Sequence, residues 1–139
     1  MKNLSISDKT KSLNKKKIHQ LVYYLSKEIS FSVQVLQINF INNKEIRELN
    51  KKHLSHDYTT DILTFDYSND KESIDAEIYI SLDEALTNSK KFKVSFETEI
   101  KRLVIHGILH LTGYDDKTPS EKKIMKRLEN RLLSKINFT

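Results

Sequence analysis

Glycine and proline are almost absent from this chain of 139 residues, and this scarcity constrains its fold more than any other feature of the sequence. Gly107, Gly113 and Pro119 are the only such residues, and all three lie between positions 107 and 119. Glycine adopts backbone conformations that other residues avoid, and it lets two backbones approach closely. A chain so poor in glycine keeps it where the backbone requires it. Residues 107–119 are therefore the first place to look for a functional site.

The length leaves room for one compact domain with a proper core, and we expect a single domain over residues 1–139. The absence of cysteine excludes a disulfide framework, a thiolate metal site and a cysteine nucleophile. No apolar run approaches the roughly 18 residues of a membrane span, and the N-terminal segment lacks the apolar stretch of a signal peptide. We therefore expect a cytoplasmic protein without a membrane partner.

The balance of charge leans towards an anionic partner. Lys and Arg number 24 against 19 Asp and Glu, which gives a formal net charge of +5. A modest positive charge of this kind is compatible with nucleic-acid binding but does not establish it.

Apolar residues recur with helical spacing in five segments, and each is predicted to form a helix. Three of these segments begin with residues spaced as in a capping box, at positions 42 and 45, 81 and 84, and 118 and 121. The last segment has an apolar stripe of Ile124, Leu128, Leu132 and Ile136. The five predicted helices cover Leu13–Ile29, the residues after Asn42, Ser81 to about Phe92, Phe96 to about Thr112, and the residues from Thr118 onward.

Alternation of apolar and polar residues predicts three strands. The first, Phe31–Ile41, changes phase midway, which indicates either a bulge or a stretch buried on both faces. The other two, Ile62–Tyr67 and Ile74–Ser81, are predicted to form a hairpin through residues 68–71, after a polar loop over residues 53–61. The order of elements predicts an α+β domain with a small mixed sheet and helices packed on it.

The strongest chemical signal lies between His106 and Asp116. His106 and His110 are four residues apart on a predicted helix, so both imidazoles lie on one face at a spacing that suits one metal ion. Gly113 can take the left-handed conformation that ends a helix, and the chain can then bring Asp116 back as a third ligand. Two histidines and a carboxylate suit Zn²⁺ with one open position. The metal site is expected on a central helix and the loop after it.

The two histidines also have an ordinary interpretation. Partly buried histidines often cap helices or line a core, and spacing alone does not distinguish these roles from metal binding.

Three blocks of the sequence resemble the YbeY family of bacterial endoribonucleases, which are associated with ribosomal RNA maturation. Residues 106–116, HGILHLTGYDD, are similar to the family signature HGxLHLxGYDH. Leu49-Asn50 followed by TDILTF at residues 60–65 resembles the family's LN…T-[DN]-[VI]-L-[ST]-F segment, and AEIYIS at residues 76–81 resembles its GDIxIS strand. The blocks occur in the family's order and together cover roughly residues 40–129.

This resemblance implies a zincin-like α+β fold, a bound zinc ion and hydrolysis of RNA phosphodiester bonds. It further implies a preference for single-stranded RNA, with a ribosomal RNA precursor as substrate and ribosomal proteins as candidate partners.

Three residues depart from the family pattern. Asp116 stands where the family usually has a third histidine, which is chemically tolerable because a carboxylate is a normal zinc ligand. Leu54 stands where many members have an arginine implicated in catalysis, so the most plausible phosphate contact is missing. Ala76-Glu77 replaces Gly-Asp, a milder change.

Several cationic side chains are candidates for contact with RNA. Lys51, Lys52 and Arg102 are candidates for substrate binding, and Arg102 lies four residues before His106 on the same helical face. Arg102 and His56 are also candidates for catalysis. His56 is of interest because a histidine can supply both charge and a proton near neutral pH. Each of them has an ordinary interpretation as a solvated surface group.

Three functions remain open from the sequence. A zinc-dependent endoribonuclease is the first. A ribosome-associated RNA-binding factor with a structural metal is the second, and Leu54 favours it. A metalloprotease is the third, and it is disfavoured because Gly107 occupies the position of the glutamate in an HExxH motif.

Overall fold

The computed structural model describes residues 2–136, which form four strands and five helices. Their bounds are β1 Leu4–Asp8, α1 Lys15–Glu28, β2 Ser32–Ile41, α2 Asn43–Leu54, β3 Ile62–Asp66, β4 Ser73–Ser81, α3 Leu82–Phe92, α4 Phe96–Leu111 and α5 Pro119–Ile136.

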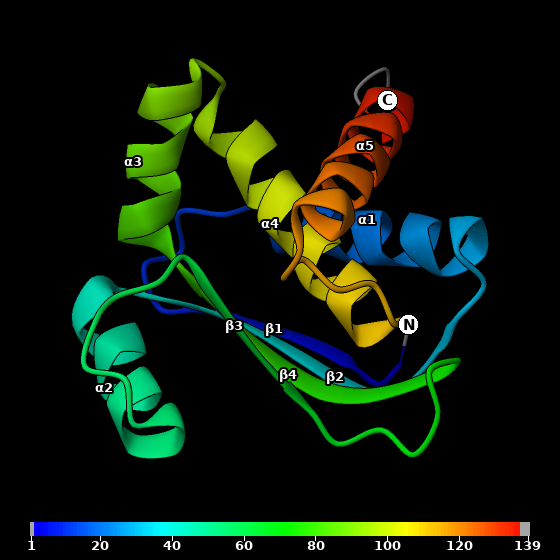
Figure 1. The fold of residues 1–139 in the computed structure, drawn as a ribbon, viewed down its shortest axis with the longest axis horizontal. Coiled ribbons are helices and arrows are strands. Elements are labelled where there is room, and N and C mark those ends of the chain that lie inside the picture. Colours follow the sequence, from blue (N-terminus) through cyan, green and yellow to red (C-terminus); the bar gives the residue numbers. More distant parts are fainter. Residues whose placement is uncertain (1, 137–139) are drawn as a thin grey trace.

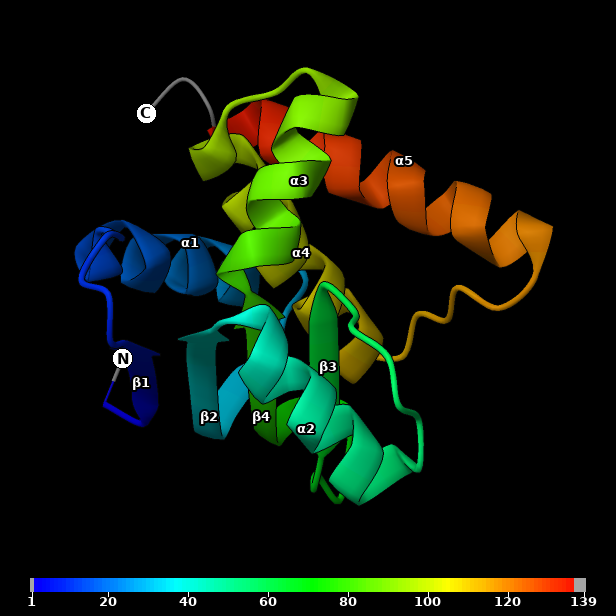
Figure 2. The ribbon, with the colours of Figure 1, turned by 90° about the vertical axis from the view of Figure 1, so that its left-hand side faces the viewer.

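The strands form one mixed sheet in the order β1-β2-β4-β3. β1 and β2 pair in parallel, as do β2 and β4, whereas β3 is antiparallel to β4 and lies at an edge. Figure 1 shows α1, α4 and α5 on one side of the sheet and α2 on the other. In Figure 2, α2 lies across β3 and β4. The fold thus encloses α4 between the sheet and the neighbouring helices.

α4 is the central helix of the molecule, and its sequence explains its position. Leu103, Val104 and Ile105 are consecutive and fully buried, so the helix packs on more than one side. A Cβ atom at Gly107 would lie 3.0 Å from Ile62 Cδ1 and 3.1 Å from Ile78 Cδ1. Glycine therefore lets the last turns of α4 approach the β3–β4 edge of the sheet, and the two histidines lie on those turns.

Most of the sequence predictions for the fold are confirmed, including its α+β class. Asn42 and Glu45 hydrogen-bond each other's backbone N–H groups, and so do Thr118 and Glu121. The Ser81 hydroxyl caps α3 by accepting from the third residue after it. The change of phase in β2 is a bulge, because the register with β4 shifts between positions 33 and 35.

Two predictions of local structure are wrong, and one strand is missed. The polar loop is predicted to begin at residue 53, but α2 continues through Leu54, so the loop begins two residues later than predicted. Ser55 caps the helix in the left-handed conformation. The apolar stripe of α5 is wrong at one position. Ile124 is 48% exposed, whereas Leu132 is buried and Leu128 and Ile136 pack against the core; Met125 and Glu129 are buried as well. β1 is missed although Leu4 and Ile6 alternate with serines, because the segment is short and pairs with β2 far along the chain.

Within residues 2–136, no helix combines the length and the apolar character that crossing a membrane requires.

Candidate metal centre

The end of α4 brings the three predicted ligands together. His106 and His110 lie one turn apart, with ring centroids 4.8 Å from each other. Gly113, at φ 112°, ends the helix in a Schellman motif: its N–H donates to the carbonyl of His110, and the N–H of Tyr114 donates to that of Leu109. The chain then returns along the helix, and Asp116 lies beside both imidazoles.

The positions of the donor atoms fit one small divalent ion. His106 Nε2 is 3.3 Å from Asp116 Oδ2, and His110 Nε2 is 3.2 Å from Asp116 Oδ1. One ligand atom from each residue can be chosen so that all lie within 4.8 Å of one another. Ligands of a tetrahedral zinc ion with bonds of roughly 2.0–2.1 Å are about 3.3 Å apart, so little movement is needed to close this site.

Behind His106, a buried carboxylate holds the other ring nitrogen. His106 Nδ1 lies 2.6 Å from Glu129 Oε2, which comes from α5. Burial by itself would lower the pKa of His106. The hydrogen bond and charge of Glu129, together with the charge of Asp116, outweigh burial and raise that pKa above its usual value.

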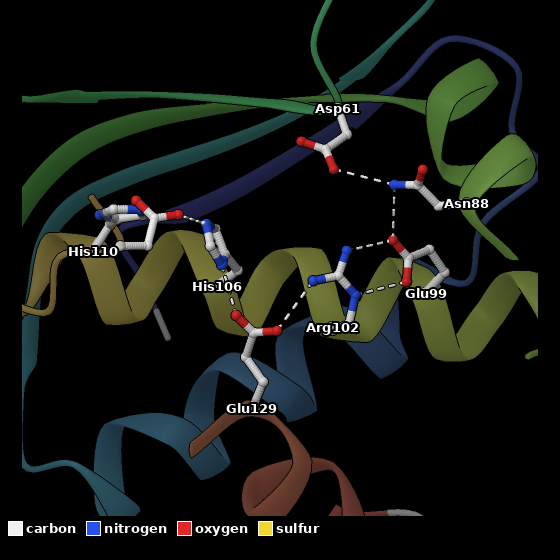
Figure 3. Close-up of polar contacts among 8 residues, drawn as sticks. Asp61, Asn88, Glu99, Arg102, His106, His110 and Glu129 are labelled. Atoms are coloured by element: carbon white, nitrogen blue, oxygen red, sulfur yellow. Dashed lines mark hydrogen bonds and ion pairs between the residues drawn. The ribbon is translucent and has the colours of Figure 1, made fainter. Parts of the chain in front are cut away.

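Arg102, which also lies on α4, contacts the same carboxylate of Glu129. Its Nη1 donates to Glu129 Oε1 at 3.0 Å, and its Nε and Nη2 donate to the two oxygens of Glu99 at 2.7 and 2.6 Å. The hydrogen bonds to Glu99 raise the pKa of Arg102 despite its burial, and Glu129 adds to the effect. Asn88 Nδ2 then bridges Glu99 Oε2 and Asp61 Oδ2, both at 3.1 Å. Figure 3 shows this polar network of Asp61, Asn88, Glu99, Arg102, Glu129 and His106.

The three candidate ligands line a cleft of about 340 Å³, which we call the metal cleft. One wall is the start of β3 with the residues before it, and Leu54 of α2 contributes to the rim. Neither lysine nor arginine is among the described residues that line this cleft, which are Leu54, Thr60, Asp61, Ile62, Leu63, Thr64, His106, His110 and Asp116.

A second groove, of about 560 Å³, lies on the other side of His106 and Asp116. It runs between α4 and α5, and its lining includes Phe92, Lys122 and Lys126. The metal cleft and this groove share His106 and Asp116, so the candidate ligands lie between two hollows of the surface.

The other predicted site residues lie apart from the metal cleft. Lys51 and Lys52 are exposed on α2, and Lys51 lines a separate hollow. His56 is exposed in the loop after α2, where its ring stacks on Tyr58 at 5.2 Å and its Nδ1 lies 3.0 Å from the Tyr58 hydroxyl. Arg102 is beside His106, as predicted, but its donors face carboxylates. Roles in RNA binding or catalysis for these four residues stay predictions.

Sequence reasoning missed Glu129, Glu99 and Asp61. A signal was present for the first two, because each is an acidic residue within the apolar spacing of its helix: Glu129 follows Met125 by one turn, and Glu99 precedes Ile100. A charged residue on a buried helix face needs an oppositely charged or hydrogen-bonding partner, so its presence in the sequence indicates a buried polar contact there. Asp61 lies in a polar loop, where its only signal is the [DN] position of the family-like segment TDILTF at residues 60–65.

The fold and the site together define an α+β protein with a metal-ligand cluster at the end of its central helix. Comparisons with known proteins identify the family. The family model described as Endoribonuclease YbeY matches residues 2–137. The chain is 45% identical to the Endoribonuclease YbeY of Parabacteroides distasonis over 95 residues, which are 68% of this chain and 66% of that protein. It is 38% identical to the Endoribonuclease YbeY of Chlorobium phaeobacteroides over 120 residues, 86% of each chain.

A solved structure agrees with these matches. The solution structure of TM1509 from Thermotoga maritima is similar to this fold with a TM-score of 0.67 and 29% sequence identity, over 96% of this chain and 88% of that one. The chain belongs to the YbeY family.

Proposed function

We propose that this chain is a single-domain, zinc-dependent endoribonuclease that cleaves single-stranded RNA and acts on a ribosomal RNA precursor in the cytoplasm. The observation that carries the proposal is the meeting of His106, His110 and Asp116 at the floor of an open cleft. The names of its relatives support RNA as the substrate.

The chemistry of the proposed site follows from its donor set. Zn²⁺ bound there supplies a Lewis acid that can polarise a phosphoryl oxygen of the RNA. Two neutral imidazoles and one carboxylate leave the occupied site with a net charge of about +1, which attracts a phosphodiester. Glu129 holds the proton of His106 at Nδ1, so that Nε2 is free for the ion. Asp61 adds a carboxylate to the wall of the same cleft.

Leu54 supports a second candidate, an RNA-binding factor in which the metal is structural. Its side chain is 45% exposed at the rim of the metal cleft, where the family pattern usually has an arginine. A cleft without that cation binds phosphate more weakly and stabilises developing charge less. Proteolysis has weaker support, because position 107 faces Ile62 and Ile78 and leaves little room for a glutamate.

One experiment separates these functions. The purified protein is incubated with labelled single-stranded RNA, with the same RNA as a duplex, and with casein, each with and without EDTA and with Zn²⁺ added back. We expect cleavage of the single strand alone, lost in EDTA and restored by Zn²⁺. RNA that is bound but uncleaved in the presence of Zn²⁺ would indicate the binding factor, and cleavage of casein would indicate a protease.

Restoring a cation at the rim should increase the rate of RNA cleavage. We expect Leu54→Arg to raise the rate constant by about tenfold or more, because the guanidinium would face a phosphate of the bound RNA. Leu86→Arg is the matched control, since Leu86 is also 45% exposed but lies on α3, outside the residues that line the metal cleft. Equal gains in the two variants would show that added charge acts from anywhere on the surface and would contradict a specific role for position 54.

A further inference from the structure

We propose that Glu129 and Arg102 are positioning residues that hold His106 ready for a metal ion, and that Arg102 does not contact RNA. The inference rests on the metal site of the proposed function.

The first step concerns the proton of His106. A neutral imidazole binds a metal through one nitrogen and carries its proton on the other. An ionised carboxylate can only accept a hydrogen bond. Glu129 Oε2 lies 2.6 Å from Nδ1, so the proton belongs on Nδ1. The lone pair of Nε2 then faces Asp116, as a shared ligand site requires.

The second step concerns the orientation of Glu129. Its carboxylate is buried, with the residue 4% exposed, and each oxygen has a different partner. Oε2 accepts from His106, and Oε1 accepts from Arg102 Nη1 at 3.0 Å. A carboxylate held at both oxygens cannot rotate without losing a hydrogen bond to a charged or ring N–H group. Arg102 therefore fixes the orientation of the Glu129 carboxylate, and this carboxylate in turn fixes the orientation of the His106 ring.

The third step excludes Arg102 from RNA binding. Its Nε and Nη2 form a two-pronged contact with Glu99, which is 1% exposed, and its Nη1 is bound to Glu129. Its two remaining N–H groups, one on Nη1 and one on Nη2, lie beside these carboxylates, whose negative charges oppose the approach of a phosphate.

The fourth step concerns charge. Glu99 and Glu129 are both buried and share the single positive charge of Arg102, which leaves an excess of one negative charge beside His106. An uncompensated buried charge is unfavourable. A divalent ion at Nε2 of His106 supplies the missing positive charge, so the polar network favours the occupied site.

The network also reaches the opposite wall of the metal cleft. Asn88 ties Glu99 to Asp61, so side chains from α3, α4, α5 and the loop before β3 are joined in one chain of hydrogen bonds (Figure 3). The same contacts that orient His106 therefore also hold the cleft wall in place.

The test measures metal affinity in purified, metal-free protein by competition for Zn²⁺ with a chromophoric chelator. We expect Glu129→Ala to weaken binding by about 10- to 100-fold. Glu129→Gln should lose less, because its amide oxygen can still accept from Nδ1. Arg102→Met should also weaken binding, and Arg102→Lys should recover part of the loss. The controls, Glu48→Gln and Arg127→Met, remove the same charges from exposed positions and should bind as the wild type does.

Two further readouts separate positioning from a general loss of structure. The visible spectrum of bound Co²⁺ should change in Glu129→Ala and not in the controls, since it reports the geometry of the ligands. In saturating Zn²⁺, Arg102→Met and Arg102→Lys should bind single-stranded RNA with the wild-type dependence on salt. A lost phosphate contact would instead reduce that slope by about 0.7.

Circular dichroism of the metal-free variants shows whether they fold. If Arg102→Met does not fold, Arg102→Lys and Glu129→Gln still decide the question. Wild-type affinity and an unchanged Co²⁺ spectrum in Glu129→Ala would overturn this inference and leave the metal site intact. A wild-type protein that binds no metal would overturn the proposed function and this inference with it.

Discussion

Asp116 is the one residue at which residues 106–116 depart from the family signature that they resemble. The proximity of the two histidines follows from helical spacing alone, but the position of Asp116 depends on the path of the chain after Gly113. Its carboxylate bridges both imidazoles, with one oxygen near each. The third ligand is therefore contributed by a turn, and it adds a negative charge that a histidine would not.

Substitutions at Asp116 should separate the loss of a ligand from a change of ligand. We expect Asp116→Ala to weaken Zn²⁺ binding by at least tenfold, because a ligand is removed and not replaced. Asp116→His should keep the metal, since an imidazole nitrogen can take the place of the oxygen. Equilibrium competition with a chelator measures both. Asp115→Ala, at the exposed neighbouring position, is the control. The assignment is wrong if Asp115→Ala loses the metal and Asp116→Ala retains it.

Gly107 sets how closely the histidine-bearing helix approaches the sheet. Gly107→Ala gains roughly 0.5–1 kcal/mol of helix propensity, but its new methyl group would meet the side chains of Ile62 and Ile78. Overpacking a core costs about 1–3 kcal/mol, so we expect a net destabilisation on the order of 1 kcal/mol in urea unfolding. Adding Ile62→Val, which removes the closest methyl group, should recover part of it. Strict additivity of the two substitutions would contradict the contact.

At the scale of elements, the sequence predicts what is local and misses what depends on distant partners. The caps at Asn42, Ser81 and Thr118 are confirmed, because each depends on residues three positions apart. β1 is missed because its five residues become a strand only by pairing with residues 36–40 of β2. Leu128, Leu132 and Ile136 of α5 pack against the core as predicted, but the buried Glu129 is missed because its partners come from α4.

β1 is joined to α1 through Asp8, a buried carboxylate at the end of the strand. Its two oxygens accept from the backbone N–H groups of Thr10 and Leu13 and from the Thr10 hydroxyl. Burial alone would raise the pKa of Asp8, but these hydrogen bonds outweigh burial and lower it. A carboxyl group whose pKa is lower in the folded than in the unfolded state stabilises the fold above its unfolded value. That contribution disappears as the pH falls through the folded value.

Asp8→Asn should therefore destabilise the protein in a pH-dependent way. At pH 7 we expect a loss of about 1–3 kcal/mol in the free energy of unfolding, because an amide replaces an ionised acceptor. The difference from wild type should shrink as the pH falls below about 3.9, the usual pKa of an unfolded aspartate. Urea titrations of the metal-free proteins at several pH values measure it. Glu72→Gln, at an exposed turn, should show no such trend, and a constant difference for Asp8→Asn would argue against the ionised acceptor.

At the scale of the whole molecule, the candidate metal centre lies where the last helix joins the rest of the fold. His106 and His110 belong to α4, Asp116 belongs to the connection between α4 and α5, and Glu129 fixes His106 from α5 itself. The sequence predicted the cluster of three ligands from spacing and from one glycine. The support behind the cluster could not be predicted, because it comes from side chains that only the packing of α3, α4 and α5 brings together (Figure 3).

A metal ion in this position should stabilise the entire fold. An ion that binds only the folded state adds about 2.7 kcal/mol when its free concentration is 100 times its Kd. For a chain of this length, such a gain raises Tm by on the order of 10 °C. We expect EDTA to lower Tm by this amount and Zn²⁺ to restore it, measured by circular dichroism. Amide exchange should slow most in residues 112–118 and α5, because the ion ties that connection to α4.

Histidine variants provide the control for the response to metal. His110→Ala should melt at the same temperature with EDTA and with Zn²⁺, because it lacks one of the three ligands. His19→Gln removes a histidine from α1, away from the cluster, and should keep the full wild-type response. A wild-type Tm that is the same in EDTA and in Zn²⁺ would mean that His106 and His110 are ordinary packing residues.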